Sequence, residues 1–178
     1  MIRKTGRPLA ALLVVALLAA LFLGLPAGPG DAGAGPEPRT TTRTVSIPAS
    51  AFAPMSDIIP YSQGPGYLET RSGSGTFMAA VYFEAPVVTI RKVVFYAMDA
   101  GSGNLIMGLY RTQVSAQETL NLGEVYTSGS AFTMQTITLS DLAERRISGA
   151  YGATLNIYLP GPYTDGYRFY GAKITYSY

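Results

Sequence analysis

From Thr44 to the last residue, Tyr178, the chain consists of short segments rich in β-branched and aromatic residues. Gly, Pro, Ser, Asn and Asp stand between these segments, a pattern typical of β-strands joined by turns. About eight or nine short strands at this spacing predict an all-β fold, an antiparallel β-sandwich of the jelly-roll type, with an up-and-down barrel as the alternative. The predicted strands are Thr44–Ile47, Gly66–Glu69, Thr76–Phe83, Thr89–Asp99, Asn104–Thr112, Leu122–Ser128, Phe132–Leu139, Ala153–Leu159 and Tyr167–Tyr178.

Two connections have their own signatures. The Gly-rich run Asp99–Asn104 predicts a hairpin loop, because glycine adopts positive φ at little cost. The segment Ser140–Arg145 begins with a good N-cap residue and predicts a helical turn or two. We expect the final strand to be paired inside a sheet, so that its deletion would unfold the domain.

The N-terminus has the pattern of an export signal. Arg3, Lys4 and Arg7 precede an apolar run over Leu9–Leu25, and Ala32–Ala34 fits an A-x-A cleavage site. The run is also nearly long enough for an uncleaved anchor helix. No cysteine follows it, which excludes a lipoprotein anchor.

We therefore expect a secreted or cell-surface protein that is exported by the general secretory route, with a membrane contact only if the leader is kept. The predicted domains are 1–34, a signal peptide or anchor; 35–43, a Pro- and Thr-rich linker; and 44–178, the β-sandwich.

The net charge of the predicted mature chain is close to zero. The whole chain has 13 basic and 11 acidic residues, and cleavage after Ala34 removes three basic residues and one acidic residue. Such a balance predicts no basic patch and no nucleic-acid partner. It also removes the mutual repulsion that opposes self-association.

The composition argues against catalysis. With no His and no Cys, the chain lacks the usual general base, thiol nucleophile and transition-metal ligands. Spacing selects no carboxylate pair, and neither Lys92 nor Lys173 lies beside a distinctive serine motif. We expect no enzyme and no cofactor, with Asp99 and Asn104 as the best candidates for a structural calcium site. The carboxylates considered for such a pair, all in predicted loops or at strand ends, are Asp99, Glu118, Glu124, Asp141, Glu144 and Asp165.

Three consecutive predicted strands, 76–83, 89–99 and 104–112, carry apolar residues at both odd and even positions. Side chains alternate between the faces of a strand, so each of these strands is apolar on both faces. The second face then requires a cover, which is a long loop or the N-terminal arm, another subunit, or a ligand on an exposed tyrosine surface. The candidate interface or ligand-binding residues are Tyr82, Tyr96, Tyr110, Met78 and Met98.

Four short motifs resemble a family of small secreted bacterial β-sandwich domains: Ser46–Phe52, Val94–Tyr96, Leu109–Arg111 and Phe169–Tyr176. The terminal Tyr-Gly-x-x-Ile strand is also similar to the last strand of C1q- and TNF-like jelly rolls. These resemblances imply the fold and export, and they carry over no binding residue.

Two functions follow from these patterns. The first is a secreted or cell-surface structural protein that self-associates, as a homo-oligomer or filament, through the tyrosine-rich face or by strand exchange. The alternative is a non-catalytic module that binds carbohydrate or another cell-surface ligand, with tyrosine rings as the stacking surface.

Overall fold

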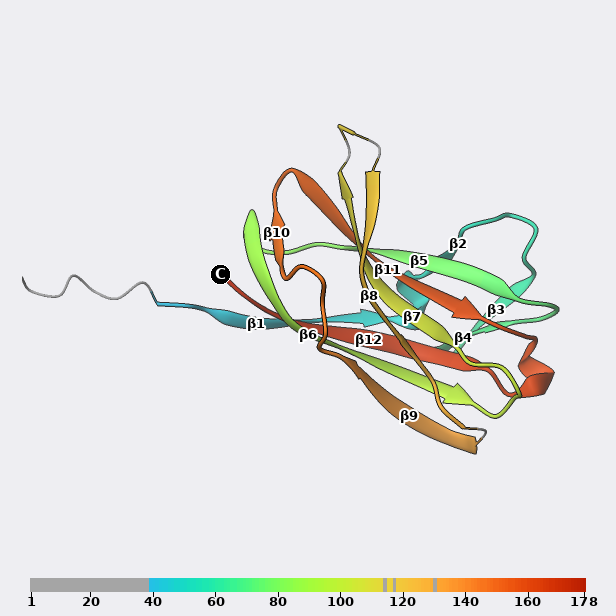
Figure 1. Cartoon of the computed structure of the whole chain (residues 1–178). Coiled ribbons are helices and arrows are strands. Elements are labelled where there is room, and N and C mark those ends of the chain that lie inside the picture. Colours follow the sequence, from blue (N-terminus) through green and yellow to red (C-terminus); the bar gives the residue numbers. More distant parts are fainter. Residues whose placement is uncertain (1–38, 114, 117, 130) are drawn as a thin grey trace, which may run out of the picture. The chain divides into compact units, whose positions relative to one another are not determined.

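Residues 39–178, apart from 114, 117 and 130, are described by a computed structural model, in which they form two antiparallel sheets (Figure 1). The seven-stranded sheet contains β1 (Thr42–Pro48), β3 (Tyr61–Gly64), β4 (Tyr67–Thr70), β6 (Val87–Asp99), β9 (Ala131–Leu139), β10 (Arg146–Ser148) and β12 (Arg168–Ser177). The five-stranded sheet contains β2 (Ala53–Pro54), β5 (Gly75–Val81), β7 (Ile106–Gln113), β8 (Glu118–Tyr126) and β11 (Tyr151–Leu159). Two short 3-10 turns, η1 (Ala49–Ala51) and η2 (Tyr163–Asp165), complete the described elements, and the predicted all-β sandwich is confirmed.

The last strand lies in the middle of its sheet. Strand β12 pairs with β6 along one edge and with β1 and β4 along the other. The free edge of β6 is shared by β10, which pairs with its first residues, and β9, which pairs with its second half. The expectation that the C-terminal strand is paired inside a sheet is therefore confirmed.

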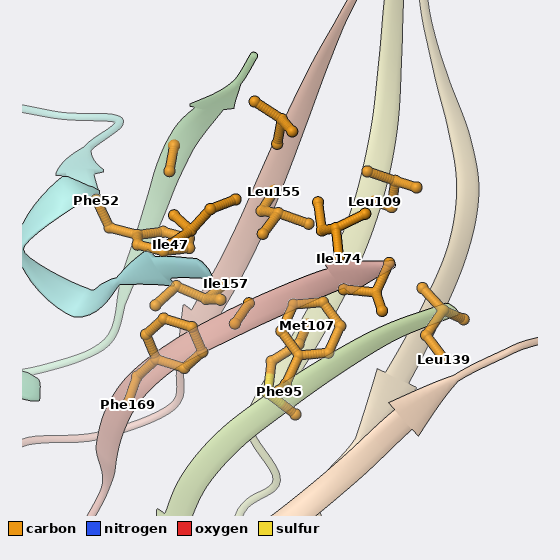
Figure 2. Packing of buried hydrophobic residues seen from close by; sticks show 14 of the residues in the cluster. Ile47, Phe52, Phe95, Met107, Leu109, Leu139, Leu155, Ile157, Phe169 and Ile174 are labelled. Atoms are coloured by element: carbon orange, nitrogen blue, oxygen red, sulfur yellow. The ribbon is translucent and has the colours of Figure 1, made fainter. Parts of the chain in front are cut away.

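The core lies between the two sheets and is made by alternate residues of their strands. On β5, Phe77, Ala79 and Val81 are buried, whereas Met78 and Ala80 between them are exposed. Figure 2 shows Phe95, Met107, Leu155 and Phe169 meeting in this core. Burial of one such side chain stabilises the fold by about 1.5–3 kcal/mol, and no disulfide contributes, since the chain has no cysteine.

Two details of the prediction were wrong. Ser140–Arg145 is irregular and not helical, because Ala143 donates its backbone N–H to Leu122 of β8 and the segment follows the sandwich edge. The strands β2, β3 and β10 were missed, since they have only two to four residues each. The turn between β3 and β4 is Pro65–Gly66, in which Gly66 has φ +89°, a conformation that favours glycine.

The predicted leader, 1–34, and residues 35–38 of the predicted linker, 35–43, lie outside the described residues, and β1 already begins at Thr42. In the part of the chain that the structure describes, no helix has the length and apolarity needed to cross a membrane.

Candidate functional site

The structure divides the five predicted site residues between the two sheets. Met78 and Tyr110 point outward from the five-stranded sheet, and Tyr82 follows the end of β5 with 84% of its surface exposed. Tyr96 and Met98 lie on β6, in the seven-stranded sheet. The tyrosines therefore do not form one continuous surface, because the order of the strands separates Tyr96 from Tyr82 and Tyr110.

The outward face of the five-stranded sheet is organised in rows that run across its strands. The strand register places Met78 of β5, Asn156 of β11, Gly108 of β7 and Glu124 of β8 side by side. Paired residues of antiparallel strands share a face, so the side chains of Met78, Asn156 and Glu124 point to one side of the sheet, where Gly108 has none. The neighbouring rows are Thr76–Tyr158–Ile106–Tyr126 and Ala80–Thr154–Tyr110–Asn121.

A groove of about 210 Å³ is hollowed into this face. Its floor is open because Gly108 has no side chain. A Cβ atom at Gly108 would lie 2.9 Å from Cε2 of Tyr110 and 3.0 Å from Cγ of Glu124. The residues around the groove are Thr76, Ile106, Tyr110, Glu124, Asn156, Ile157 and Tyr158, of which Ile157 has its side chain in the core.

A carboxylate bound by two phenols stands at one side of the groove. The hydroxyl of Tyr110 donates a short hydrogen bond to Oε1 of Glu124, and the hydroxyl of Tyr126 lies 3.3 Å from Oε2. Burial, and then the hydrogen bond to Glu124, raises the pKa of Tyr110 above its usual range. The phenol therefore stays protonated and continues to orient the carboxylate, whose remaining lone pairs are free to accept from a ligand.

An unused acceptor lies on the opposite side of the same row. The Oδ1 atom of Asn156 is buried and has no hydrogen-bond partner among the described residues. Leaving such a group unpaired costs about 1–3 kcal/mol, so an ordered water or a group of a ligand is expected to donate to it. Together with Glu124, Asn156 makes the groove rich in acceptors, and the ring of Tyr158 adds an apolar wall.

Two other hollows lack this combination of side chains in their described linings. The larger, of about 630 Å³, lies at the sandwich edge between β8 and β9, and its described lining includes no aromatic side chain. The other, of about 450 Å³, contains Tyr82, Phe83 and Tyr151, yet its described lining includes no carboxylate and no amide side chain. The groove over Gly108 alone among the three combines rings with a carboxylate and an amide.

The buried carboxylate of Asp99, a calcium candidate from the sequence, is used within the hairpin loop. Asp99 is fully buried, and its two oxygens accept hydrogen bonds from the backbone N–H of Gly101 and the hydroxyl of Thr127. Thr127 in turn accepts from the N–H of Leu105, so Asp99 fixes the hairpin loop instead of presenting ligands to solvent. Among the described residues, no three acidic side chains come together as a metal site would require.

Of the five predicted site residues, Tyr110 lines this groove, and Met78 lies in the same row as Gly108 without lining it. Their role as site residues stays a prediction, and Glu124 was considered only as one of six carboxylates for a catalytic pair. Asn156 and Tyr158 were missed, since β11 becomes the neighbour of β5 and β7 only through long-range pairing. The available signal was the polar residues at alternate positions of 151–159, which mark a strand face that is not wholly buried.

No protein-family model matches the chain, and no curated protein matches it. Among solved structures, it is similar to the family 36 carbohydrate-binding module of a xylanase from the hindgut metagenome of Trinervitermes trinervoides, with 9% identity and a TM-score of 0.47 over 75% of this chain and 96% of the other. The C-terminal family 6 module of a marine laminarinase from Zobellia galactanivorans has 16% identity and a TM-score of 0.47 over 75% and 99%. A family 35 carbohydrate-binding module from Clostridium thermocellum has 12% identity and a TM-score of 0.45 over 74% and 97%. These values are too low to transfer a ligand or a binding residue to this chain.

Proposed function

We propose that this chain is a non-catalytic binding module for a neutral glycan, and that the glycan lies in the groove over Gly108. The observation that carries the proposal is the combination of Tyr110, Glu124, Asn156 and Tyr158 around one open hollow. Pockets with apolar walls and a few convergent polar groups are the usual form of a small-molecule site.

The chemistry of the groove suits a sugar. A pyranose has an apolar C–H face that packs against an aromatic ring, and hydroxyls around its edge that donate hydrogen bonds. Tyr158 and Tyr110 supply ring surface, and tyrosine combines a large ring with a polar tip. Glu124 and Asn156 supply acceptors, so hydroxyl groups of the ligand would complete their hydrogen bonding.

A carboxylate in the groove also favours a neutral ligand over an acidic one. The outward-facing positions of β5, β7, β8 and β11 hold no lysine or arginine within the described residues, so no cation there offsets Glu124. A uronate in the groove would face the Glu124 carboxylate without a counter-charge, which is unfavourable.

The test is affinity electrophoresis of the purified protein in gels that contain laminarin, galactomannan or soluble cellulose oligosaccharides. The native protein is expected to be retarded by at least one of them. Replacement Glu124→Gln is expected to weaken that retardation about tenfold, the usual effect of losing a charge-assisted hydrogen bond. Glu118→Gln is the matched control, since Glu118 is exposed at the start of the same strand and does not line the groove.

No retardation by any neutral glycan would contradict the proposal, and so would equal losses in Glu124→Gln and Glu118→Gln. Self-association as a homo-oligomer or filament stays a prediction, but Tyr96 lies in the other sheet from Tyr110, so the tyrosines do not form one shared interface. Its measurement is the solution mass by light scattering over a concentration series, where a mass that rises with concentration would indicate assembly.

A further inference from the structure

The outward face of the seven-stranded sheet gathers half of the ten arginines and lysines found in residues 39–178. The strand register assigns the residues of this face. Lys173 of β12 pairs with Val94, Lys92 of β6 pairs with Thr175, and Arg146 of β10 pairs with Thr89. The full set is Arg91, Lys92, Arg146, Arg168 and Lys173, and the acidic residue among them is Glu69.

An irregularity in β6 places two neighbouring cations on this face. The register shifts between Thr175 and Tyr176, so that two residues of β6 stand where regular pairing would place one. In a β-bulge of this kind two successive side chains point to the same side. Arg91 and Lys92 are both exposed, between the buried Ile90 and Val93, and the Nε of Arg91 donates to the hydroxyl of Ser177.

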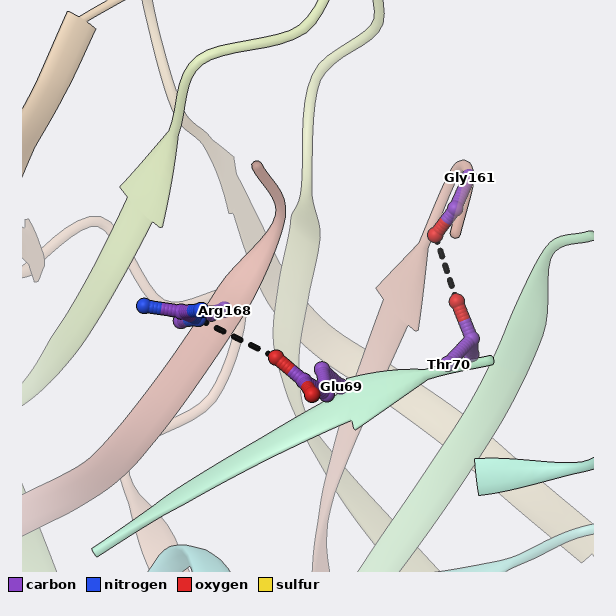
Figure 3. A network of polar contacts seen from close by, with 4 residues as sticks. All are labelled: Glu69, Thr70, Gly161 and Arg168. Carbon is purple, nitrogen blue, oxygen red and sulfur yellow. Dashed lines mark hydrogen bonds and ion pairs between the residues drawn. The ribbon is translucent and has the colours of Figure 1, made fainter. Parts of the chain in front are cut away.

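Tyrosine rings lie between the cations. The Nζ atom of Lys173 is 5.7 Å from the ring centroid of Tyr96, and the guanidinium of Arg168 is 4.6 Å from that of Tyr67. Contacts of this kind hold a charged head near a fixed position above the sheet. Figure 3 shows the ion pair between Arg168 and Glu69, in which Nε and Oε2 are 3.0 Å apart.

The ion pair with Glu69 satisfies Arg168 and leaves the other cations available. The ion pairs found among the described residues involve none of Lys92, Arg146 and Lys173. These three residues occupy three neighbouring strands, β6, β10 and β12. A net charge near zero is therefore compatible with a basic face on one sheet. The expectation that no basic patch exists was wrong, because the composition of a chain does not show which strands are paired.

We propose that this face binds a carboxylate-bearing polysaccharide, separately from the neutral-glycan groove on the opposite sheet. The register places these cations on a diagonal across the sheet. Arg146 stands opposite Thr89, and Lys92 follows three residues later on β6. Lys173 stands opposite Val94, two residues further on. With strands about 4.8 Å apart and a rise of about 3.3 Å per residue, neighbouring cations are roughly 8–11 Å apart, about the length of two pyranoses in an extended chain. The cations would therefore meet carboxylates on alternate sugars.

The polar positions between the cations favour a polysaccharide over other polyanions. Thr44 and Thr175 bring their hydroxyls to within 3.2 Å of each other on this face, and Thr136 and Thr138 of β9 extend the row of hydroxyls beyond β6. A ligand that carries hydroxyls between its charges uses these groups, whereas a lipid surface offers a layer of phosphates without them.

The experiment is affinity electrophoresis of the purified protein in gels that contain polygalacturonate, repeated at rising salt. Retardation is expected at low salt and is expected to fall as salt screens the charges. The double replacement Lys92→Gln/Lys173→Gln is expected to weaken binding about tenfold, since two desolvated charge contacts are lost. The matched control is Arg39→Gln/Arg43→Gln, which removes the same charge from positions off this face.

Equal losses in the two double variants would overturn the proposal, because they would show an effect of net charge alone. Retardation by duplex DNA or binding to phosphatidylserine vesicles, with none by polygalacturonate, would also overturn it. Failure here is distinct from failure of the neutral-glycan proposal: Lys92→Gln/Lys173→Gln leaves neutral-glycan retardation unchanged, and Glu124→Gln leaves polygalacturonate retardation intact.

Discussion

At the scale of single residues, Gly108 is the position on which the shape of the groove depends. Glycine inside a strand weakens it by about 0.5–1 kcal/mol relative to alanine, because it loses more backbone freedom and packs no side chain. The chain nevertheless has glycine at this position, where a Cβ atom would contact the side chains of Tyr110 and Glu124. We attribute this glycine to the proposed binding site, which needs the space that a Cβ atom would fill.

We predict that Gly108→Ala reduces neutral-glycan binding and leaves stability nearly unchanged. The added methyl would displace the Tyr110 ring or the Glu124 side chain, both of which line the groove. Gly152→Ala is the control, since its Cβ would lie 3.9 Å from the nearest atom found, the carbonyl oxygen of Thr112. Affinity electrophoresis and urea denaturation measure the two effects, and equal glycan binding by both variants would contradict the role of Gly108.

The titration of Tyr110 gives a second prediction at this scale. Its pKa is raised in the folded state, so its contribution to stability is complete below the ordinary tyrosine pKa of about 10 and is lost as the pH rises further. Ultraviolet titration of the phenols is expected to show one group ionising later than the exposed tyrosines. Tyr110→Phe is expected to remove that late step. A late step that persists in Tyr110→Phe would mean that another tyrosine is responsible.

At the scale of elements, β12 connects most of the seven-stranded sheet. It pairs with β6 on one side and with β1 and β4 on the other, and its register with β6 shifts between Phe169 and Gly171. Gly171 has φ +140°, and a Cβ there would lie 2.6 Å from the carbonyl oxygen of Ile47 on β1.

We predict that Gly171→Ala destabilises the protein by about 1–3 kcal/mol, the range for a non-glycine residue held in a strained conformation. The clash falls on backbone and not on a flexible side chain, so β1 must shift for the alanine to fit. Urea denaturation against Gly152→Ala measures the difference. Equal midpoints for the two variants would show that the β1–β12 pairing adapts without cost.

The same elements show what the sequence could predict. Long strands such as β6 and β12 were found because their β-branched and aromatic residues form long runs, and the two-sheet fold followed from their number. Apolar residues at both odd and even positions of three strands also predicted a second apolar face. Strand order could not be predicted, since it depends on contacts between residues far apart in the chain. For that reason Tyr96 was grouped with Tyr110, and Asn156 was not placed beside Gly108.

At the scale of the whole molecule, the two outward faces differ in charge. The seven-stranded sheet presents Arg91, Lys92, Arg146 and Lys173, whereas the groove in the five-stranded sheet presents Glu124. The two sheets pack against each other through one core, and this packing holds both outward faces in place. The two proposed binding sites therefore differ in chemistry and have no residue in common.

The last prediction is that a neutral glycan and polygalacturonate bind at the same time and stabilise the protein additively. A ligand that binds only the folded state adds about 2.7 kcal/mol at a free concentration one hundred times its Kd. Sites without shared residues are expected to add to within about 0.5 kcal/mol. Thermal unfolding with each ligand alone and with both measures the sum. If the second ligand gives no further rise in Tm, the two compete for one surface, and the assignment of separate chemistries to the two sheets is wrong.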